Sequence, residues 1–177
     1  MPPQLPLRAL SAAEEDARAE VVGRPQLHED ATGAIDTSGQ HWRGKDMTDP
    51  PEYLREFRAG GYAVEDVTES VCAGCSGRSF RVAVDEEEGC AERVCVACGA
   101  GVYLADSAAY ADGAELEWCE CPCGADTFAV ALGFARAADR EVRWISIGLR
   151  CPADSTLGVY ADWKIDYSPT AHLLTSA

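Results

Sequence analysis

The strongest constraint on the fold of this chain is a set of four cysteines arranged in two close pairs. Cys72 and Cys75 form one C-x₂-C pair, and Cys95 and Cys98 form a second after 19 intervening residues. Two such pairs at this separation are typical of a zinc site, because each pair turns tightly enough to direct both thiolates at one tetrahedral ion. We therefore expect these four cysteines to bind one zinc ion.

The use of cysteine favours metal ligation over disulfide bonding. The chain of 177 residues has 9 cysteines, an odd number that fits poorly with complete pairing. Its N-terminus lacks the basic start and apolar core of a signal peptide, and no apolar run approaches the roughly 20 residues that span a bilayer. We therefore expect a cytoplasmic protein with reduced thiols and no membrane attachment.

The charge balance argues against the commonest role of small zinc modules, which is binding nucleic acid. Lys and Arg together number 15 and Asp and Glu 30, which gives a net charge of -15, and the acidic excess recurs in every region. Nucleic-acid binding usually depends on Lys and Arg that contact phosphates. A protein with a basic surface is the partner that this charge favours.

Residues 1–46 are predicted to form a disordered tail. They mix Pro, Gly, Ala and charged residues without a sustained apolar period. A capping-box pattern at residues 11–14 predicts one short helix within them, over residues 11–22. Because the first clear folding pattern begins after Met47, this methionine is a candidate start of the natural protein, and an ordinary flexible tail is the alternative.

Residues 47–71 are predicted to form a short helix and a linker. Asp49 can cap the helix, two prolines suit its first turn, and Gly60 suits the left-handed position at its end. Three apolar side chains fall on one helix face: Tyr53, Leu54 and Phe57. We expect this face to pack on the sheet that follows.

The stretch around the four cysteines is predicted to be an antiparallel sheet. Residues 79–84 alternate as a half-buried strand, an acidic turn follows, and strands are expected at 91–94 and 101–104. In this order of elements, residues 72–106 resemble the zinc-ribbon superfamily. The resemblance implies a three-stranded antiparallel sheet with zinc held by Cys72, Cys75, Cys95 and Cys98.

Residues 107–177 repeat this plan, which predicts an internal duplication. Phe128 follows Cys123 by five residues, as Phe80 follows Cys75. Residues 95–98 align with 151–154 and residues 101–103 with 158–160, so that Tyr103 matches Tyr160. Long strands are expected at 126–134 and 141–149. The predicted fold class is mainly β: two tandem zinc-ribbon-like antiparallel units, one short N-terminal helix and a disordered tail.

The metal ligands of the second unit are less regular, because Asp154 stands where the repeat predicts a fourth cysteine. Zinc could be held by Cys121, Cys123 and Cys151 with Asp154 as an oxygen ligand, or by the same cysteines with Cys119 as a fourth thiolate. A third alternative is a metal-free unit with a larger core. The sequence leaves these three open.

Catalytic motifs are scarce. None of the three histidines (His28, His41 and His172) accompanies a nucleophile motif, and the chain has no H-E-x-x-H, P-loop or dinucleotide glycine pattern. A thioredoxin-like role for the C-x₂-C pairs would require a βαβ context. Cys90 is interpreted as a spare thiol, and Tyr160, Asp162 and Asp166 as one polar strand face that could bind a basic partner.

The function predicted from these features is a non-catalytic, zinc-stabilised acidic module that binds a protein, as an adaptor or an inhibitor does. An alternative is a small-molecule-binding or enzyme accessory protein with its site between the two ribbons. A nucleic-acid-binding zinc ribbon is the third. A deep pocket between the units would favour the second of these functions.

Overall fold

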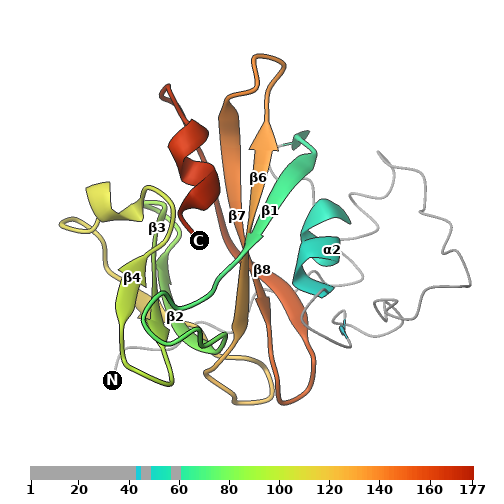
Figure 1. The fold of residues 1–177 in the computed structure, drawn as a ribbon, viewed down its shortest axis with the longest axis vertical. Coiled ribbons are helices and arrows are strands. Elements are labelled where there is room, and N and C mark those ends of the chain that lie inside the picture. The colour runs from blue at the N-terminus through green and yellow to red at the C-terminus, as the bar shows by residue number, and fades with distance from the viewer. Residues whose placement is uncertain (1–42, 45–48, 57–60) are drawn as a thin grey trace, which may run out of the picture.

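The computed structural model describes residues 43–44, 49–56 and 61–177, and the following account concerns these ranges. The predicted helix at 11–22, nearly all of the predicted tail, Met47, Phe57 and Gly60 lie outside them. The fold is mainly β, as predicted, with two four-stranded antiparallel sheets and one α-helix (Figure 1). None of the described helices is long and apolar enough to cross a membrane.

The large sheet has the strand order β1-β6-β7-β8 and the small sheet the order β4-β3-β2-β5. The strands of the large sheet are β1 (Val64–Glu69), β6 (Ala129–Arg136), β7 (Val142–Arg150) and β8 (Leu157–Lys164). Those of the small sheet are β2 (Phe80–Asp85), β3 (Cys90–Cys95), β4 (Gly101–Tyr103) and β5 (Glu117–Trp118). The strands predicted from alternation are all present, with ends displaced by a few residues.

The two repeats exchange their first strands. β1 precedes the cysteines of the first repeat, yet it pairs with β6 of the second. β5 precedes the cysteines of the second repeat, yet it pairs with β2 of the first. Each sheet therefore contains three strands of one repeat and the first strand of the other, so the two units are interlocked.

The exchange follows a two-fold axis that relates the repeats. The equivalent residues Phe80 and Phe128 pair with each other, each donating its backbone N–H to the other's carbonyl at 2.9 and 2.8 Å. On either side, Ser70 donates to Val130 at 2.9 Å and Cys119 donates to Val82 at 2.8 Å. A residue that pairs with its own counterpart must lie on the axis, so the backbone supports the duplication inferred from the sequence.

The structural correspondence between the last strands of the two repeats, β4 and β8, differs by one residue from the alignment predicted from the sequence. Tyr103 of β4 pairs with Glu92, and Val159 of β8 pairs with Gly148, each partner lying three residues before the third cysteine of its repeat. Tyr103 therefore corresponds to Val159, and the predicted match to Tyr160 is wrong. The reason is a bulge in β8, where the pairing passes from Val159 to Ala161.

A shared apolar core joins the two sheets. It draws large side chains from both: Phe80, Val82, Leu104, Phe128, Leu132, Phe134, Ile145 and Ile147. Asp106, which follows β4, accepts hydrogen bonds from Trp163 Nε1 at 3.2 Å and Tyr167 Oη at 2.9 Å, which lie in and after β8. Because the same core lies under both cysteine-rich ends, each repeat helps to hold the other in place.

The helix α2 (Asp49–Glu56) covers the other face of the large sheet (Figure 1). Prolines at its second and third positions suit a first turn, where backbone N–H groups have no helical partner. Tyr53 and Leu54 are buried, as predicted, but against the large sheet and not the sheet of residues 80–103. Leu54 lies over two glycines: a Cβ added to Gly133 or Gly148 would meet it at 3.5 or 2.9 Å.

Two short 3₁₀ helices complete the fold, η2 (Ser107–Ala109) after β4 and η3 (Ala171–Thr175) near the C-terminus. The segment that ends the chain runs back to the first repeat. Ala105 donates its N–H to the carbonyl of Ser176 at 2.8 Å, and Thr68 donates its hydroxyl to the carbonyl of Leu174 at 2.9 Å. These contacts connect the small sheet to β1 through the last residues of the chain.

Candidate metal centres

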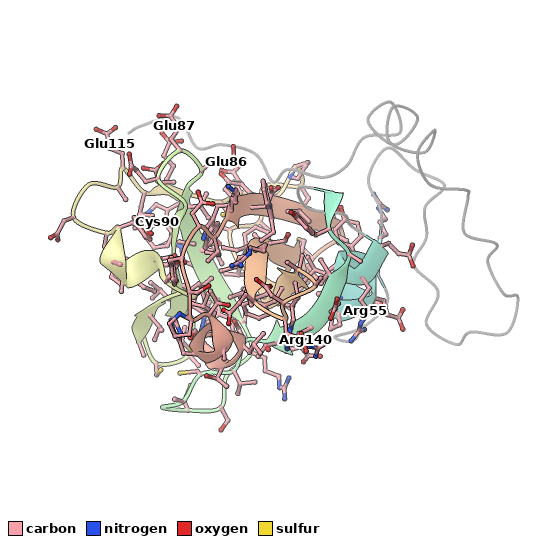
Figure 2. All side chains as sticks on the ribbon, turned by 90° about the horizontal axis from the view of Figure 1, so that it is seen from above. Arg55, Glu86, Glu87, Cys90, Glu115 and Arg140 are labelled. Carbon is pink, nitrogen blue, oxygen red and sulfur yellow. The ribbon has the colours of Figure 1, made fainter. Side chains whose placement is uncertain are left out.

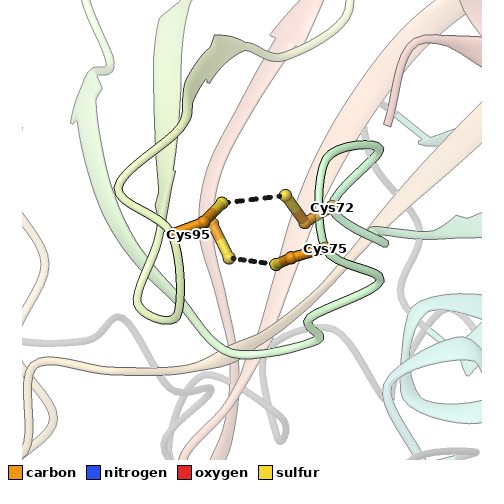
Figure 3. Close-up of side chains that lie close together, drawn as sticks. Cys72, Cys75 and Cys95 are labelled. Atoms are coloured by element: carbon orange, nitrogen blue, oxygen red, sulfur yellow. Dashed lines mark hydrogen bonds between the residues drawn. The ribbon is translucent and has the colours of Figure 1, made fainter.

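Centre 1 is formed by the four cysteines that the spacing singled out: Cys72, Cys75, Cys95 and Cys98. Their sulfur atoms lie within 4.8 Å of one another, with 3.5 Å both from Cys72 to Cys98 and from Cys75 to Cys95. Figure 3 shows Cys72 and Cys75 on one loop facing Cys95 on the other. A zinc ion bound at 2.3 Å separates its sulfur ligands by about 3.8 Å, so these distances fit a tetrahedral ion.

The local backbone places these thiols. In the first loop the N–H of Ser76 donates to the carbonyl of Cys72 at 2.8 Å, and Ser76 has a left-handed backbone with φ 59°. Gly77 passes so close to the centre that a Cβ there would meet the sulfurs of Cys95 and Cys75 at 3.1 and 3.2 Å. The loop thus needs a glycine at this position to close around the ligands.

Backbone amides in centre 1 favour the thiolate form of Cys72 and Cys95, whereas the neighbouring thiols raise the pKa of Cys75 to about 12. Backbone N–H groups of Gly74 and Cys75 lower the pKa of Cys72 to about 6. The backbone N–H of Cys98 likewise lowers the pKa of Cys95. Since the thiolate is the metal-binding form, amides directed at the sulfurs prepare the site for a cation.

Centre 2 lies at the equivalent end of the second repeat and consists of Cys121, Cys123, Cys151 and Asp154. The sulfurs of Cys123 and Cys151 are 3.6 Å apart, and the Cys121 sulfur is 3.7 Å from Asp154 Oδ1. Asp154 is the third residue after Cys151, as Cys98 is after Cys95. The structure therefore brings together the ligand set with an oxygen donor.

Asp154 is fixed by its own loop. Its Oδ1 accepts the N–H of Thr156 at 3.0 Å and its Oδ2 accepts the Thr156 hydroxyl at 2.8 Å. Burial alone would raise the pKa of Asp154, but the two Thr156 donors and the nearby thiols outweigh it, so that the pKa lies below its ordinary value. The side chain is therefore an ionised carboxylate with one oxygen facing the thiols of centre 2.

Cys119, the alternative fourth ligand of the sequence prediction, lies outside both groups of ligand atoms. It is buried, and its thiol has the Tyr160 hydroxyl as a hydrogen-bond neighbour. Burial raises the pKa of Cys119 well above its ordinary value, which disfavours the thiolate. The backbone explains this placement, because Cys119 lies where the second repeat crosses to β2.

Cys90 also lies apart from the two centres. Its buried thiol donates to the carbonyl of Ser107 at 3.4 Å. Burial raises the pKa of Cys90, and the nearby charge of Asp85 adds to this effect. The geometry agrees with the interpretation of Cys90 as a thiol that binds no metal.

The polar strand face predicted around Tyr160 is exposed only in part, since Tyr160 is buried, Asp162 is half-buried and Asp166 is exposed. Tyr160 is 2% exposed, and Asp162 accepts the indole N–H of Trp144 at 2.8 Å. Asp166 forms an ion pair with Lys164. The alternation over β8 predicted one exposed and one buried face, but residues 157–161 of β8 are buried on both sides, by the core and by α2, and exposure begins only at its C-terminal end.

A different acidic surface, which the sequence analysis missed, lies at one edge of the small sheet. It consists of the β2–β3 turn and a residue from the loop before β5: Asp85, Glu86, Glu87, Glu88 and Glu115. We call these residues the acidic edge, and Figure 2 shows Glu86, Glu87 and Glu115 close together on it. The acidic run in the turn was visible in the sequence, but its meeting with Glu115 depends on the pairing of β5 with β2.

Asp85 holds the acidic edge together. Its Oδ1 accepts the N–H groups of Glu87 and Glu88 at 2.9 and 3.1 Å, and its Oδ2 accepts that of Glu115 at 2.8 Å. Burial by itself would raise the pKa of Asp85, but these three donors lower it below its ordinary value. The ionised Asp85 thus fixes two loops and directs their carboxylates outward together.

Both centres could hold a metal ion, and their donor atoms define the chemistry available to them. Each offers four protein ligands, which is the arrangement of a structural site. All nine cysteines are free thiols, so no disulfide competes for the ligands. Comparisons of the chain with family models, curated proteins and solved structures return no match.

Proposed function

We propose that this protein is a non-catalytic, zinc-stabilised module that binds the basic surface of a protein partner through its acidic edge. The observation that carries the proposal is the arrangement of the acidic edge, in which Asp85 fixes Glu87, Glu88 and Glu115 side by side. Zinc is proposed for the two centres because thiolate-rich tetrahedral sites suit this ion.

The ion pairs of the described residues leave three glutamates of the acidic edge without a cationic partner. Ion pairs of the described residues join Arg78 to Glu69, Arg81 to Asp126, Arg136 to Asp66, Arg140 to Glu65, Arg143 to Asp139, Arg150 to Asp49 and Lys164 to Asp166. None of these pairs includes Glu87, Glu88 or Glu115, which are exposed. Such a patch attracts a positively charged surface and speeds its association.

A catalytic role has less support. A metal ion held by four protein ligands has no open position for a water molecule or a substrate. His172 is the histidine among the described residues, and its ring stacks on that of Tyr167, with 6.5 Å between the centroids. A binding function accounts for the acidic edge without requiring a reactive group.

No specific observation favours either alternative, a small-molecule-binding or enzyme accessory protein or a nucleic-acid-binding zinc ribbon. The shared apolar core lies between the sheets, which gives the small-molecule alternative no support there. One cavity on the described surface is an open groove of about 480 Å³ beside α2 and β1. Nucleic-acid binding would place phosphates against carboxylates, which repel them.

The acidic edge is tested by affinity purification from the native cell with the zinc-loaded protein. The triple variant Glu87→Gln, Glu88→Gln, Glu115→Gln should lose its partner, because it removes three charges without removing Asp85. The matched control, Glu52→Gln, Glu56→Gln, Asp166→Asn, removes three charges elsewhere and should keep it. Recovery of the same proteins by both variants, with no sensitivity to salt, would rule out the acidic edge as the binding surface.

A further inference from the structure

The two metal centres are related by the internal two-fold axis, so their differences can be compared position by position. The fourth ligand is a thiolate in centre 1, from Cys98, and a carboxylate in centre 2, from Asp154. A second difference lies two residues before the third cysteine ligand of each centre, which is Cys95 in centre 1 and Cys151 in centre 2. Arg93 occupies this position in the first repeat and Leu149 in the second.

Arg93 places a buried positive charge beside centre 1. Its guanidinium lies over the ring of Phe80, at 4.5 Å from the centroid, and it donates to the carbonyl of Val71 at 3.4 Å. Arg93 is 4% exposed, and the charges of Cys72 and Cys95 act on it directly. Four thiolates around a divalent ion carry a net charge of about -2, which a neighbouring cation partly neutralises.

Centre 2 lacks both stabilising features. Its carboxylate is a harder donor than a thiolate and matches a soft ion less well. Leu149, the counterpart of Arg93, is fully buried and uncharged. The nearest arginine in the sequence, Arg150, is engaged by Asp49 at 3.7 Å and by Ser155 Oγ at 3.1 Å.

Asp154 has partners that do not depend on a metal. Because Thr156 donates to both of its oxygens, the carboxylate stays hydrogen-bonded when no ion is bound. Loss of the ion from centre 2 therefore leaves no unpaired carboxylate. In centre 1 the counterpart of Asp154 is Cys98. Its thiol has no hydrogen-bond donor equivalent to Thr156 to hold it when the ion leaves.

The loop that carries Cys151 and Asp154 also fastens the start of α2. Gly44 donates its N–H to the carbonyl of Ser155 at 2.8 Å, and Arg43 forms an isolated antiparallel bridge with Thr156. Arg150 connects Ser155 to Asp49, the first residue of α2, whose side chain is fully buried. Any rearrangement of this loop is transmitted to the N-terminal end of α2.

We propose that centre 2 is an exchangeable metal site, which gains and loses a divalent cation such as zinc while centre 1 retains its ion, and that the bound cation secures α2 on the large sheet. This inference rests on the proposed binding of zinc at both centres. It assigns them different tasks: centre 1 holds the fold together, and centre 2 responds to the availability of the metal.

The proposal is tested by challenging the zinc-loaded full chain with a chelator and following the remaining ions by native mass spectrometry. We expect two phases, with the first ion leaving about tenfold faster than the second or more. The variant Asp154→Cys should slow the fast phase, and the matched variant Cys98→Asp should accelerate the slow one. A single phase, or a fast phase unchanged in Asp154→Cys, would overturn the assignment.

Hydrogen exchange measured on the same samples tests the connection to α2. Amides of residues 52–56 in α2 should exchange about tenfold faster or more after the first ion has left, whereas those of β2 and β3 should be unchanged until the second ion leaves. Unchanged exchange in α2 would overturn this part. Because no partner protein takes part in either measurement, failure of the acidic edge to bind a protein would leave these outcomes unaffected, and a chain that binds no zinc would be recognised before the chelator is added.

Discussion

At the scale of single residues, the identity of the fourth ligand decides the chemistry of each centre. Cys98 and Asp154 occupy equivalent positions, and the loops around them make the same backbone hydrogen bonds: Gly99 donates to the carbonyl of Cys95 and Ser155 to that of Cys151, at 2.8 and 2.9 Å. One side chain therefore changes within a conserved backbone frame. Cys119, although only two residues from Cys121, belongs to the strand exchange and not to the centre.

The ligand assignment predicts a clear difference in metal content between two variants. Asp154→Ala should contain one zinc ion fewer per chain than the wild-type protein, because it removes an oxygen ligand of centre 2. Cys119→Ser should keep the wild-type content, because it changes a buried thiol that lies outside the centre. Elemental analysis of the purified proteins measures both. A loss of zinc in Cys119→Ser with none in Asp154→Ala would mean that the cysteine is the fourth ligand.

At the scale of elements, one side chain of α2, Leu54, fits closely onto the surface of the large sheet. Leu54 is fully buried and lies over Gly133 and Gly148, whose missing side chains leave room for it. The small sheet has Glu92 where the large sheet has Gly148. Glycine within a strand weakens the strand itself, and here the packing of the helix offsets that cost.

This packing predicts a coupling between the helix and the sheet. Leu54→Ala should lower the free energy of unfolding by about 2–5 kcal/mol, since it leaves a cavity. Gly148→Ala should lower it by about 1–3 kcal/mol, because the new Cβ would lie 2.9 Å from Leu54 Cδ1. The double variant should lose less than the sum of the two changes, since the smaller side chain makes room for the methyl group. Denaturant unfolding of the four proteins measures this, and strictly additive losses would contradict it.

At the scale of the whole molecule, the exchange of first strands makes the two repeats one folding unit. β1 completes the sheet of the second repeat, and β5 completes that of the first. The core is continuous between them, and the C-terminal segment returns to contact Ala105 and Thr68. Neither repeat contains all the strands of its own sheet.

The exchange predicts that the protein stays together after its chain is cut between the repeats. A protease site inserted between Asp112 and Gly113, which are exposed, should be cleaved without separating the fragments. The two fragments should co-elute in size-exclusion chromatography and separate only in denaturant, because each contributes a strand to the other's sheet. Separation under native conditions would show that the repeats are independent units.

The sequence predicted the parts of this fold that depend on local patterns. The cysteine spacing identified centre 1, the alternation over 79–84 and 91–94 identified β2 and β3, and the punctuation around Asp49 identified α2. Long-range pairings left no comparable signal. β5 is two residues long, so nothing in its sequence indicates that it pairs with β2. The bulge at Tyr160 could not be predicted from the sequence. With a one-residue insertion in the second repeat, the sequences of the two repeats still match, so Tyr103 aligns with Tyr160 although it pairs as Val159 does.

The choice between Asp154 and Cys119 likewise required the structure. Both residues are near the other ligands in the sequence, and both are chemically able to bind zinc. What separates them is the path of the backbone, which carries Cys119 toward Val82 in the small sheet and leaves Asp154 on the loop beside Cys151. The burial of Tyr160 and the pairing of Asp162 with Trp144 follow from packing on both sides of β8, which alternation cannot reveal.

The exchange of first strands also governs the order in which the molecule can assemble during its synthesis. β1 leaves the ribosome well before β6, the strand with which it pairs, has been translated. The first repeat can close its hairpin of β2 and β3 early, but it must wait for β5 before its sheet is complete. Nascent chains of this protein therefore carry an unpaired strand edge until most of the second repeat has emerged. During this period they are most prone to aggregation.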